Sequence, residues 1–281
     1  MYYIQENDKP KMLEKLFSIV KIEDDNIILP LKNDEFNDKT AYKLSQKTRK
    51  ILNKTNCNKI ILSKKIKEQE LYVNYLCSYN YQIVDGKRLF KMLIFDVLEY
   101  VVNYQKKGFD KMKIVIMVND ISEYAIYVIT KLIEKYKYIK IVTNHIEKLK
   151  KIENKIFEEK GIMISIGNNK RKALSKADII LNIDFPTELI NRYNINSEAI
   201  IVNFNGKVII KDKRFNGINI KDYEITWANC SINKKMDKFY TKDIYEAEHN
   251  FNIPIKDVLD KLKRDKVKIK KLIAQNMEIN I

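Results

Sequence analysis

Residues 113–123, KIVIMVNDISE, decide the fold class of this chain. Five apolar residues in a row, Ile114 to Val118, are followed by a polar turn and then by apolar residues at helical spacing over residues 122–136. A short unbroken apolar run is typical of a strand buried on both faces, and a helix directly after it is typical of a βαβ unit. The stretch therefore predicts the first strand and helix of a domain built on a parallel sheet.

The same alternation of apolar runs and helical patterns continues toward the C-terminus. It favours a parallel sheet covered by helices on both faces, because strands buried in this way lack polar positions. The expected strands are residues 113–118, 139–142, 162–166, 178–183 and 199–203, and the expected helices are residues 122–136, 146–160, 171–176 and 187–193.

A smaller α/β region is expected before this domain, with strands over residues 26–31, 59–62 and 81–84 and helices over residues 11–20, 38–53 and 68–78. Residues 87–105 form a helical pattern that is apolar on most sides, as expected of a helix packed between two bodies. A last helix is expected over residues 255–274. We thus expect an α/β protein of two lobes: a small N-terminal α/β domain with the connecting helix (1–106), a Rossmann-like parallel-sheet domain (107–228), and a C-terminal loop and helix (229–281).

Composition restricts the class of protein. The chain has 281 residues, of which 45% are hydrophobic, and this suffices for two modest cores. No apolar run approaches the roughly 18 residues of a membrane span, and the first ten residues are too polar for a signal peptide. The three cysteines, Cys57, Cys77 and Cys230, are widely spaced and odd in number. We therefore expect a cytoplasmic protein without a membrane span, a disulfide framework or a cysteine-histidine metal site.

The formal net charge of +16 raises the alternative of a nucleic-acid or acidic-partner binding protein. Only six of the 53 basic residues are arginine, the residue that most often reads bases and phosphate forks. Residues 261–271 contain seven basic residues and one acidic residue, and on a helix these would surround an apolar stripe. A generally lysine-rich surface is favoured over a dedicated nucleic-acid site.

Three segments resemble the shikimate dehydrogenase group, within a wider class of bilobed proteins that includes glutamyl-tRNA reductase. They are the strand 114–118, the run 141–145 (IVTNH), and the run 177–182 (ADIILN). Their order and spacing agree with that family over about 110 residues. The resemblance implies a dinucleotide site at the carboxyl edge of the second sheet. The residues of this chain at that edge are Asn119, Ser122, Thr143, Asn144, His145 and Asp184.

The chain departs from the family at the loop that would hold the cofactor. A dinucleotide site needs glycines after the first strand, so that the backbone can approach the pyrophosphate. Here the turn is Asn119-Asp120-Ile121-Ser122-Glu123, which has no glycine and two carboxylates. His145 stands where the resemblance implies an arginine for the 2'-phosphate of NADP. NAD(P) is therefore disfavoured as a cofactor, and Ser122 or Asp120 is interpreted mainly as a helix cap.

The resemblance also implies a catalytic aspartate in a turn that opens the connecting helix, and the matching residue is Asp85. Its implied partner is a lysine, for which Lys64 and Lys65 are the candidates. Their spacing to Asp85 is shorter than in the family, and the usual preceding asparagine and proline are missing. A turn before the helix is the favoured interpretation of Asp85-Gly86, and acid–base catalysis is the alternative.

The leading hypothesis is a cytoplasmic Rossmann-like protein of dehydrogenase ancestry that has lost ordinary dinucleotide binding. It would bind another ligand, a small anion in a cleft between the lobes, or would act in regulation. An active NAD(P)-dependent oxidoreductase with an atypical loop is the first alternative. A basic protein that binds nucleic acid or an acidic partner is the second.

Overall fold

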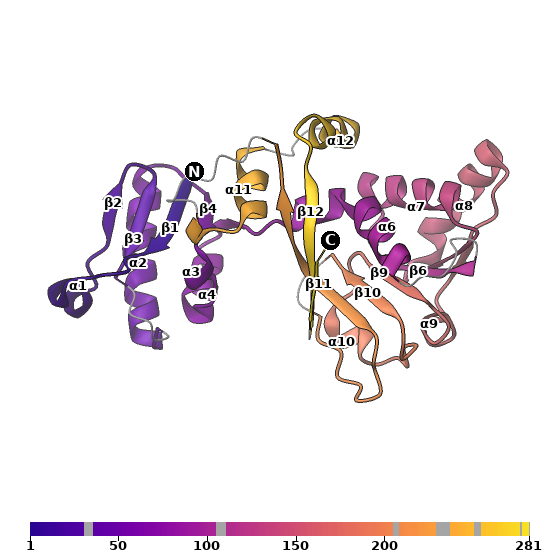
Figure 1. Cartoon of the computed structure of the whole chain (residues 1–281), viewed down its shortest axis with the longest axis horizontal. Coiled ribbons are helices and arrows are strands. Elements are labelled where there is room, and N and C mark those ends of the chain that lie inside the picture. The colour runs from indigo at the N-terminus through magenta and orange to yellow at the C-terminus, as the bar shows by residue number, and fades with distance from the viewer. Residues whose placement is uncertain are drawn as a thin grey trace. The chain divides into compact units, whose positions relative to one another are not determined.

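The computed structural model of the protein describes residues 1–30, 36–104, 111–204, 208–228, 237–249, 254–275 and 277–280. The chain forms two compact units, each with its own sheet (Figure 1). The first unit is Met1–Arg88 with Trp227–Ile253, and the second is Leu89–Thr226 with Pro254–Ile281. The expected α/β class with two sheets is confirmed. The expected boundaries at 106/107 and 228/229 involve residues outside the described ranges, so that division stays a prediction.

The first unit is built on a five-stranded sheet of order β2-β3-β1-β4-β5. Only the β2–β3 pair is antiparallel. Its elements are β1 (Tyr2–Glu6), α1 (Met12–Phe17), β2 (Lys21–Glu23), β3 (Asn26–Leu29), α2 (Asp38–Lys54), β4 (Lys59–Leu62), α3 (Lys64–Lys67), α4 (Glu70–Ser78), β5 (Gln82–Val84) and α11 (Thr241–Glu248).

Both faces of the first sheet are covered, because successive side chains of a strand point to opposite faces. Ile60 and Leu62 of β4 belong to a core that includes buried residues of α2, α3 and α4. Ile61, between them, faces the other way and packs with Phe239 and Ile244 from the segment 237–249. The first sheet is thus a middle layer, and part of its cover comes from a segment far along the chain.

The parallel strands of the first sheet reverse their spatial order between β1 and β4. The chain passes from β1 to β3 on one side, and then through α2 to β4 on the other side. In open α/β sheets, ligands bind at such a switch point, outside the carboxyl ends of the strands. Here these ends are Glu6 in β1 and Ser63, directly after β4.

The second unit is built on an eight-stranded sheet of order β13-β12-β11-β10-β9-β6-β7-β8. Numbered along the chain from β6, its parallel strands have the order 6-5-4-1-2-3, which is that of a Rossmann fold. Its elements are α5 (Lys87–Met92, which begins in the first unit), α6 (Ile94–Tyr104), β6 (Lys113–Met117), α7 (Glu123–Lys135), β7 (Tyr138–Val142), α8 (Ile146–Lys160), β8 (Ser165–Gly167), α9 (Lys170–Leu174), β9 (Ile179–Asn182), α10 (Thr187–Ile190), β10 (Ile200–Asn203), β11 (Ile218–Thr226), α12 (Ile255–Arg264), β12 (Lys268–Ala274) and β13 (Glu278–Asn280).

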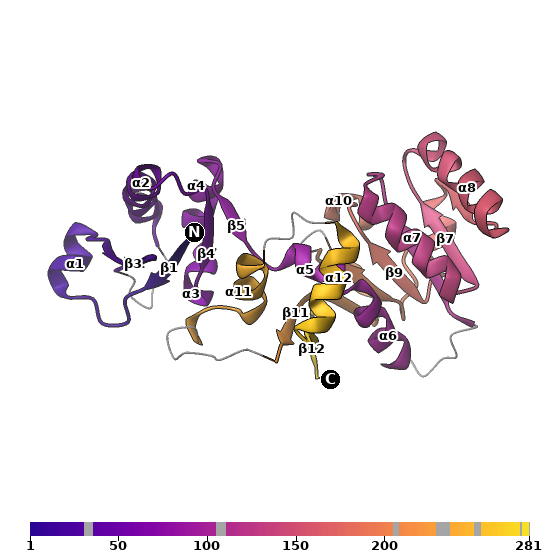
Figure 2. The same cartoon turned by 90° about the horizontal axis from the view of Figure 1, so that it is seen from above.

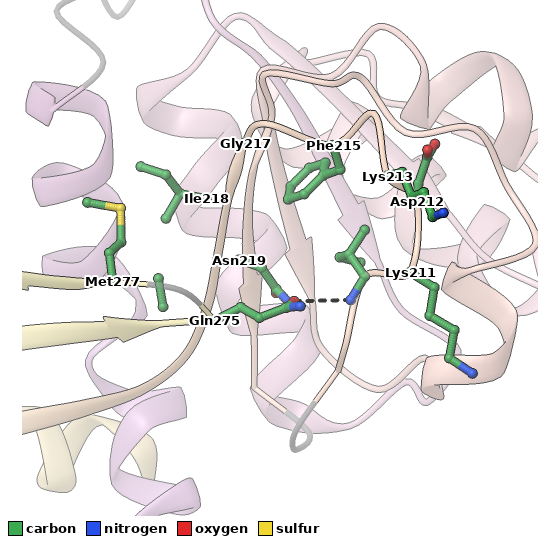
Figure 3. Close-up of a pocket in the computed structure, with 11 residues that line it drawn as sticks. Lys211, Asp212, Lys213, Phe215, Gly217, Ile218, Asn219, Gln275 and Met277 are labelled. Atoms are coloured by element: carbon green, nitrogen blue, oxygen red, sulfur yellow. Dashed lines mark hydrogen bonds between the residues drawn. The ribbon is translucent and has the colours of Figure 1, made fainter.

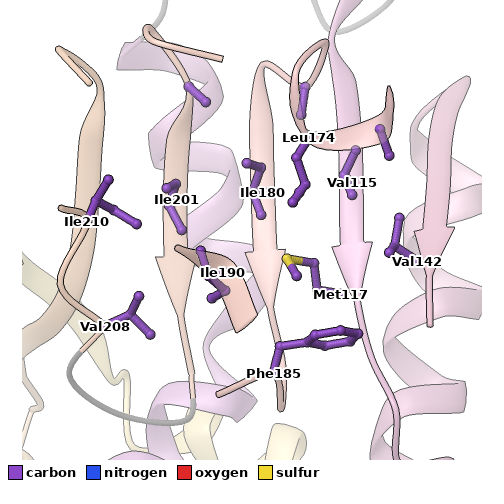
Figure 4. Packing of buried hydrophobic residues seen from close by; sticks show 13 residues of the cluster. Val115, Met117, Val142, Leu174, Ile180, Phe185, Ile190, Ile201, Val208 and Ile210 are labelled. Atoms are coloured by element: carbon purple, nitrogen blue, oxygen red, sulfur yellow. The ribbon is translucent and has the colours of Figure 1, made fainter. Parts of the chain in front are cut away.

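One face of the second sheet is packed by side chains from alternate strand positions (Figure 4). Val115 and Met117 of β6 lie beside Ile180 of β9 and Ile201 of β10, and α9 and α10 close this layer with residues such as Leu174 and Ile190. Elsewhere in this unit α6 packs on α7, where the rings of Phe95 and Tyr127 meet edge-on at 5.9 Å; both helices are seen from above in Figure 2.

The C-terminal part of the chain corrects one prediction. The helix expected over residues 255–274 ends at Arg264, and residues 268–274 form β12, which pairs with β11. Lys266 adopts a left-handed conformation with φ of 50° and ends the helical path. The basic residues 261–271 therefore do not share one helix face, which removes the main support for a basic helical binding surface.

Candidate functional site

The loop after β6 meets the end of β9 at the switch point of the second sheet. Asp184 accepts hydrogen bonds there from the backbone N–H of Asn119, at 2.8 and 2.9 Å to its two carboxylate oxygens, and from the backbone N–H of Asp120 at 2.6 Å. In a dinucleotide-binding Rossmann domain, N–H groups of this loop face the pyrophosphate. In this protein a carboxylate of the chain itself takes their hydrogen bonds.

The other residues of the predicted cofactor site also have local structural roles. The Ser122 hydroxyl caps α7 by accepting from Ala125 N at 3.2 Å. The Asn119 side-chain oxygen accepts from the backbone N–H of Asn144 at 2.9 Å, and Thr143 Oγ1 accepts from that of His145 at 3.0 Å. The structure thus gathers these residues at one edge of the sheet and engages several of their polar groups with one another.

A second polar cluster lies at the switch point of the first sheet. Glu6 and Ser63 are both buried, and the Ser63 hydroxyl donates to the Glu6 carboxylate. Lys238 donates to the Glu6 carbonyl at 3.0 Å and lies 2.7 Å from the Asp8 carboxylate. The ends of β1 and β4 are in this way tied to the segment 237–249.

An ion pair between a partly buried lysine and a buried aspartate joins this segment to α3. Asp243 is fully buried, and one of its carboxylate oxygens accepts a hydrogen bond from Lys67. Its other oxygen, Oδ1, is also buried and has no hydrogen-bond partner among the described residues. Burial raises the pKa of Asp243 from 3.8 to about 6; the nearby charge of Lys67 opposes this shift and that of Asp85 adds to it. A carboxyl group of this kind can exchange a proton near neutral pH.

Three lysine ammonium groups surround one tyrosine ring in the same cluster. The Nζ atoms of Lys64, Lys67 and Lys242 lie 5.5, 5.1 and 5.2 Å from the centroid of the Tyr240 ring. An aromatic face attracts cations, and Lys67 is in addition paired with the Asp243 carboxylate. Lysines gathered in this way give the site a positive charge that can attract an anion. We call Glu6, Ser63, Lys64, Lys67, Lys238, Tyr240, Lys242 and Asp243 the edge cluster.

Of the residues predicted as catalytic, Lys64 belongs to the edge cluster, and all three have partners other than those expected. The Asp85 carboxylate pairs with the Lys87 ammonium group at 2.7 Å and accepts a hydrogen bond from the Lys87 backbone N–H at 3.2 Å, as expected for a residue that forms a turn. Lys64 donates to the Asp237 carbonyl at 3.1 Å, and Lys65 lies 3.6 Å from Asp8. A catalytic role for Asp85, Lys64 or Lys65 stays a hypothesis. The lysine that contacts a buried aspartate here is instead Lys67, which pairs with Asp243.

Sequence reasoning missed Lys67 and Asp243 because 176 residues separate them. Neither residue lies in a motif, and the topology of the chain alone brings them together. A weaker signal was present in the switch-point rule, which directs attention to the residues after β1 and β4 once the strand order is known.

Within the described ranges, no group of three or more histidine, cysteine, aspartate or glutamate side chains is arranged to hold a metal ion. In the same ranges, no helix combines the length and hydrophobicity needed to cross a membrane.

Comparison with known proteins gives a distant structural resemblance only. No protein-family model matches the chain, and no curated protein matches it. L-tryptophan dehydrogenase from Nostoc punctiforme aligns with 71% of this chain at 12% identity and a TM-score of 0.34, and the alignment spans 62% of the dehydrogenase. Ornithine transcarbamoylase from Giardia lamblia (12% identity, 72% of each chain, TM-score 0.28) and ornithine carbamoyltransferase from Pyrococcus furiosus (13% identity, 75% of each chain, TM-score 0.28) are similarly distant. These likenesses to bilobed α/β enzymes concern the fold alone.

Proposed function

We propose that this protein is a Rossmann-type ligand-binding protein that does not bind NAD(P) in the ordinary way. The observation that carries the proposal is the Asp184 carboxylate on the backbone N–H groups of Asn119 and Asp120. A pyrophosphate at this place would have to displace the carboxylate, and until then would meet a like charge. The glycine-free loop agrees with this, because side chains at residues 119–123 hinder close approach by a phosphate.

The proposed ligand is a small anion at the edge cluster. Support comes from its position at a switch point, from the lysines around the Tyr240 ring, and from Oδ1 of Asp243, which has no hydrogen-bond partner within the described part of the chain. The lysines suit a phosphate or carboxylate group, and Oδ1 suits a hydroxyl or amine of the same ligand.

A thermal-shift experiment tests both parts of the proposal. Millimolar NAD or NADP should leave the melting temperature unchanged, whereas phosphate, pyrophosphate or succinate at 10 mM should raise it by a few degrees, since a bound ligand stabilises the folded state. The rise should be lost in Lys64→Gln and kept in Lys54→Gln, an exposed lysine at the end of α2. A clear rise with NAD(P), or equal anion responses in both variants, would contradict the proposal.

Acid–base chemistry on the bound ligand is a second candidate, favoured by the contact between Lys67 and Asp243 and by the raised pKa of Asp243. Under this second candidate function, the protein is an enzyme whose rate depends on a group that titrates near pH 6. If turnover is found for any ligand of the edge cluster, Asp243→Asn should abolish this pH dependence. An unchanged pH profile would exclude Asp243 as the acid or base.

A further inference from the structure

A row of buried side-chain amides crosses the second sheet. Asn182 ends β9, Asn203 ends β10 and Asn219 lies near the start of β11, and all three are at most 2% exposed. Gln275 follows β12 and is the fourth member. A buried amide costs free energy unless its hydrogen bonds are made. The number of hydrogen bonds that these amides make, and the direction of each bond, are therefore the important features of the row.

Each of the three asparagines donates to the next amide in the row. Asn182 Nδ2 donates to Asn203 Oδ1 at 3.0 Å, Asn203 Nδ2 to Asn219 Oδ1 at 2.6 Å, and Asn219 Nδ2 to Gln275 Oε1 at 3.0 Å. Hydrogen bonds that point the same way along a chain polarise one another, so the donor at the far end becomes stronger. That donor is the side-chain NH₂ of Gln275.

Backbone groups fix this direction at both ends of the row. Asn182 accepts from Phe185 N at 2.9 Å and donates to its carbonyl at 3.0 Å, so its amide cannot be flipped without losing both bonds. Asn219 donates to the carbonyl of Val208 at 2.7 Å, and Gln275 Oε1 accepts from Ile210 N at 3.2 Å. In Figure 3 a dashed line marks the hydrogen bond that Gln275 Oε1 accepts from Ile210 N. The side-chain oxygen of Gln275 faces the row, and its NH₂ group has no hydrogen-bond partner among the described residues.

Gln275 and Asn219 line a cavity of about 290 Å³ within the second unit (Figure 3). Its lining also contains the apolar residues Phe215, Ile218 and Met277 and the exposed basic residues Lys211 and Lys213. Among the described residues neither lysine forms an ion pair. The acidic residue of the lining, Asp212, accepts a hydrogen bond from Arg214 N at 2.9 Å.

We propose that this cavity binds a small carboxylate with an apolar, ring-sized body, and that the NH₂ of Gln275 donates to the carboxylate. The oxygen atoms of a carboxylate ligand can accept a hydrogen bond from the polarised NH₂ of Gln275, and its negative charge suits Lys211 and Lys213. The apolar body of the ligand suits Phe215 and Ile218. The site lies in the second unit and shares no residue with the edge cluster. The proposal therefore stands or fails independently of the proposed function.

Titration of the ¹⁵N-labelled full chain with benzoate, followed by NMR, tests the site directly. The side-chain NH₂ resonances of Gln275, assigned by through-bond experiments on the unmodified protein, should shift on addition of benzoate and not of benzylamine, which has a ring but no acceptor oxygen. Gln275→Glu keeps the size of the side chain and an oxygen for the row but replaces the donor with a negative oxygen. It should weaken benzoate binding on the order of 10-fold or more.

Gln82→Glu is the matched control, because it makes the same charge change at an exposed position in β5 of the first unit. It should leave benzoate affinity unchanged. The proposal is overturned if 10 mM benzoate leaves the Gln275 NH₂ resonances of the unmodified protein in place, or if benzylamine moves them equally. The first of these measurements does not depend on whether any variant folds.

Discussion

At the scale of single residues, Asp184 acts as an internal anion. Replacing it with alanine frees the backbone N–H groups of Asn119 and Asp120 and removes their charge-assisted hydrogen bonds. We expect a loss of stability on the order of 2 kcal/mol, because these bonds are strong but the carboxylate is only partly buried. We also expect the variant to respond more than the unmodified protein to 10 mM pyrophosphate in a thermal-shift assay. An equal response would mean that Asp184 does not exclude anions from the loop.

Asp243 should make stability depend on pH in an unusual direction. Its pKa is raised from 3.8 to about 6 by burial, so between these values the folded protein keeps a proton that the unfolded chain releases. The contribution of Asp243 to the free energy of unfolding is thus fully present below about pH 4, is lost as the pH rises toward 6, and does not change further above 6. This shift corresponds to roughly 3 kcal/mol.

Urea unfolding between pH 4 and pH 7 measures this contribution as a difference between two proteins. Other titrating groups affect the unmodified protein and Asp243→Asn alike, so the free energy of unfolding of the unmodified protein should fall relative to the variant as the pH rises. Parallel curves for the two proteins would show that Asp243 does not titrate in this range.

At the scale of elements, β11 begins where two backbone segments come unusually close. A Cβ atom on Gly217 would lie 2.1 Å from the carbonyl oxygen of Ala199 and 2.8 Å from the ring of Phe215. The β10–β11 pairing would have to open to admit it, since Ala199 O also accepts from Ile218 N at 3.1 Å. We expect Gly217→Ala to cost about 3 kcal/mol or more in chemical denaturation.

Gly167→Ala provides the control for Gly217→Ala within the same sheet. A Cβ at Gly167 meets no atom closer than 4.0 Å, and this glycine does not have a positive φ. Its replacement should change stability by less than about 1 kcal/mol. Similar losses in the two variants would mean that the close approach at Gly217 relaxes easily.

Elements whose side chains follow one period could be predicted from the sequence, and elements that depend on distant partners could not. Residues 59–62 and 146–160 were predicted with the observed bounds of β4 and α8. In β12, the spacing of Ile269, Leu272 and Ile273 also fits a helix, and the pairing of β12 with β11 contains bulges. The local pattern of apolar residues therefore did not distinguish a strand from a helix. The left-handed turn at Lys266 lacks the glycine that usually marks the end of a helix.

The candidate sites were only partly predictable for the same reason. Asn119 and Asp184 were identified as residues of the sheet edge, but their mutual hydrogen bond follows from the strand order. Glu6 belongs to β1, which the sequence did not predict: only Ile4 and Glu6 are buried in it, and a buried glutamate makes sense only beside Ser63 and Lys238.

At the scale of the whole molecule, the chain leaves the first unit at Arg88 and returns to it at Trp227. The returning segment supplies Phe239, which is 4% exposed, packs with Ile61 and Val84, and meets the Tyr3 ring edge-on at 5.4 Å. The same segment supplies Lys238, Tyr240 and Asp243 to the edge cluster. The stability of the first unit and the shape of its candidate site therefore depend on residues that are synthesised after most of the second unit.

Phe239→Ala should destabilise the first unit selectively. Removing a buried phenylalanine leaves a cavity and costs about 3 to 4 kcal/mol. Since each unit has its own sheet and core, hydrogen exchange should accelerate in β1, β4 and β5 and stay unchanged in β6, β9 and β10. The matched variant Phe185→Ala, which removes a 1% exposed ring from the core of the second unit, should give the opposite pattern. Equal acceleration in both sheets for either variant would show that the two units unfold as one.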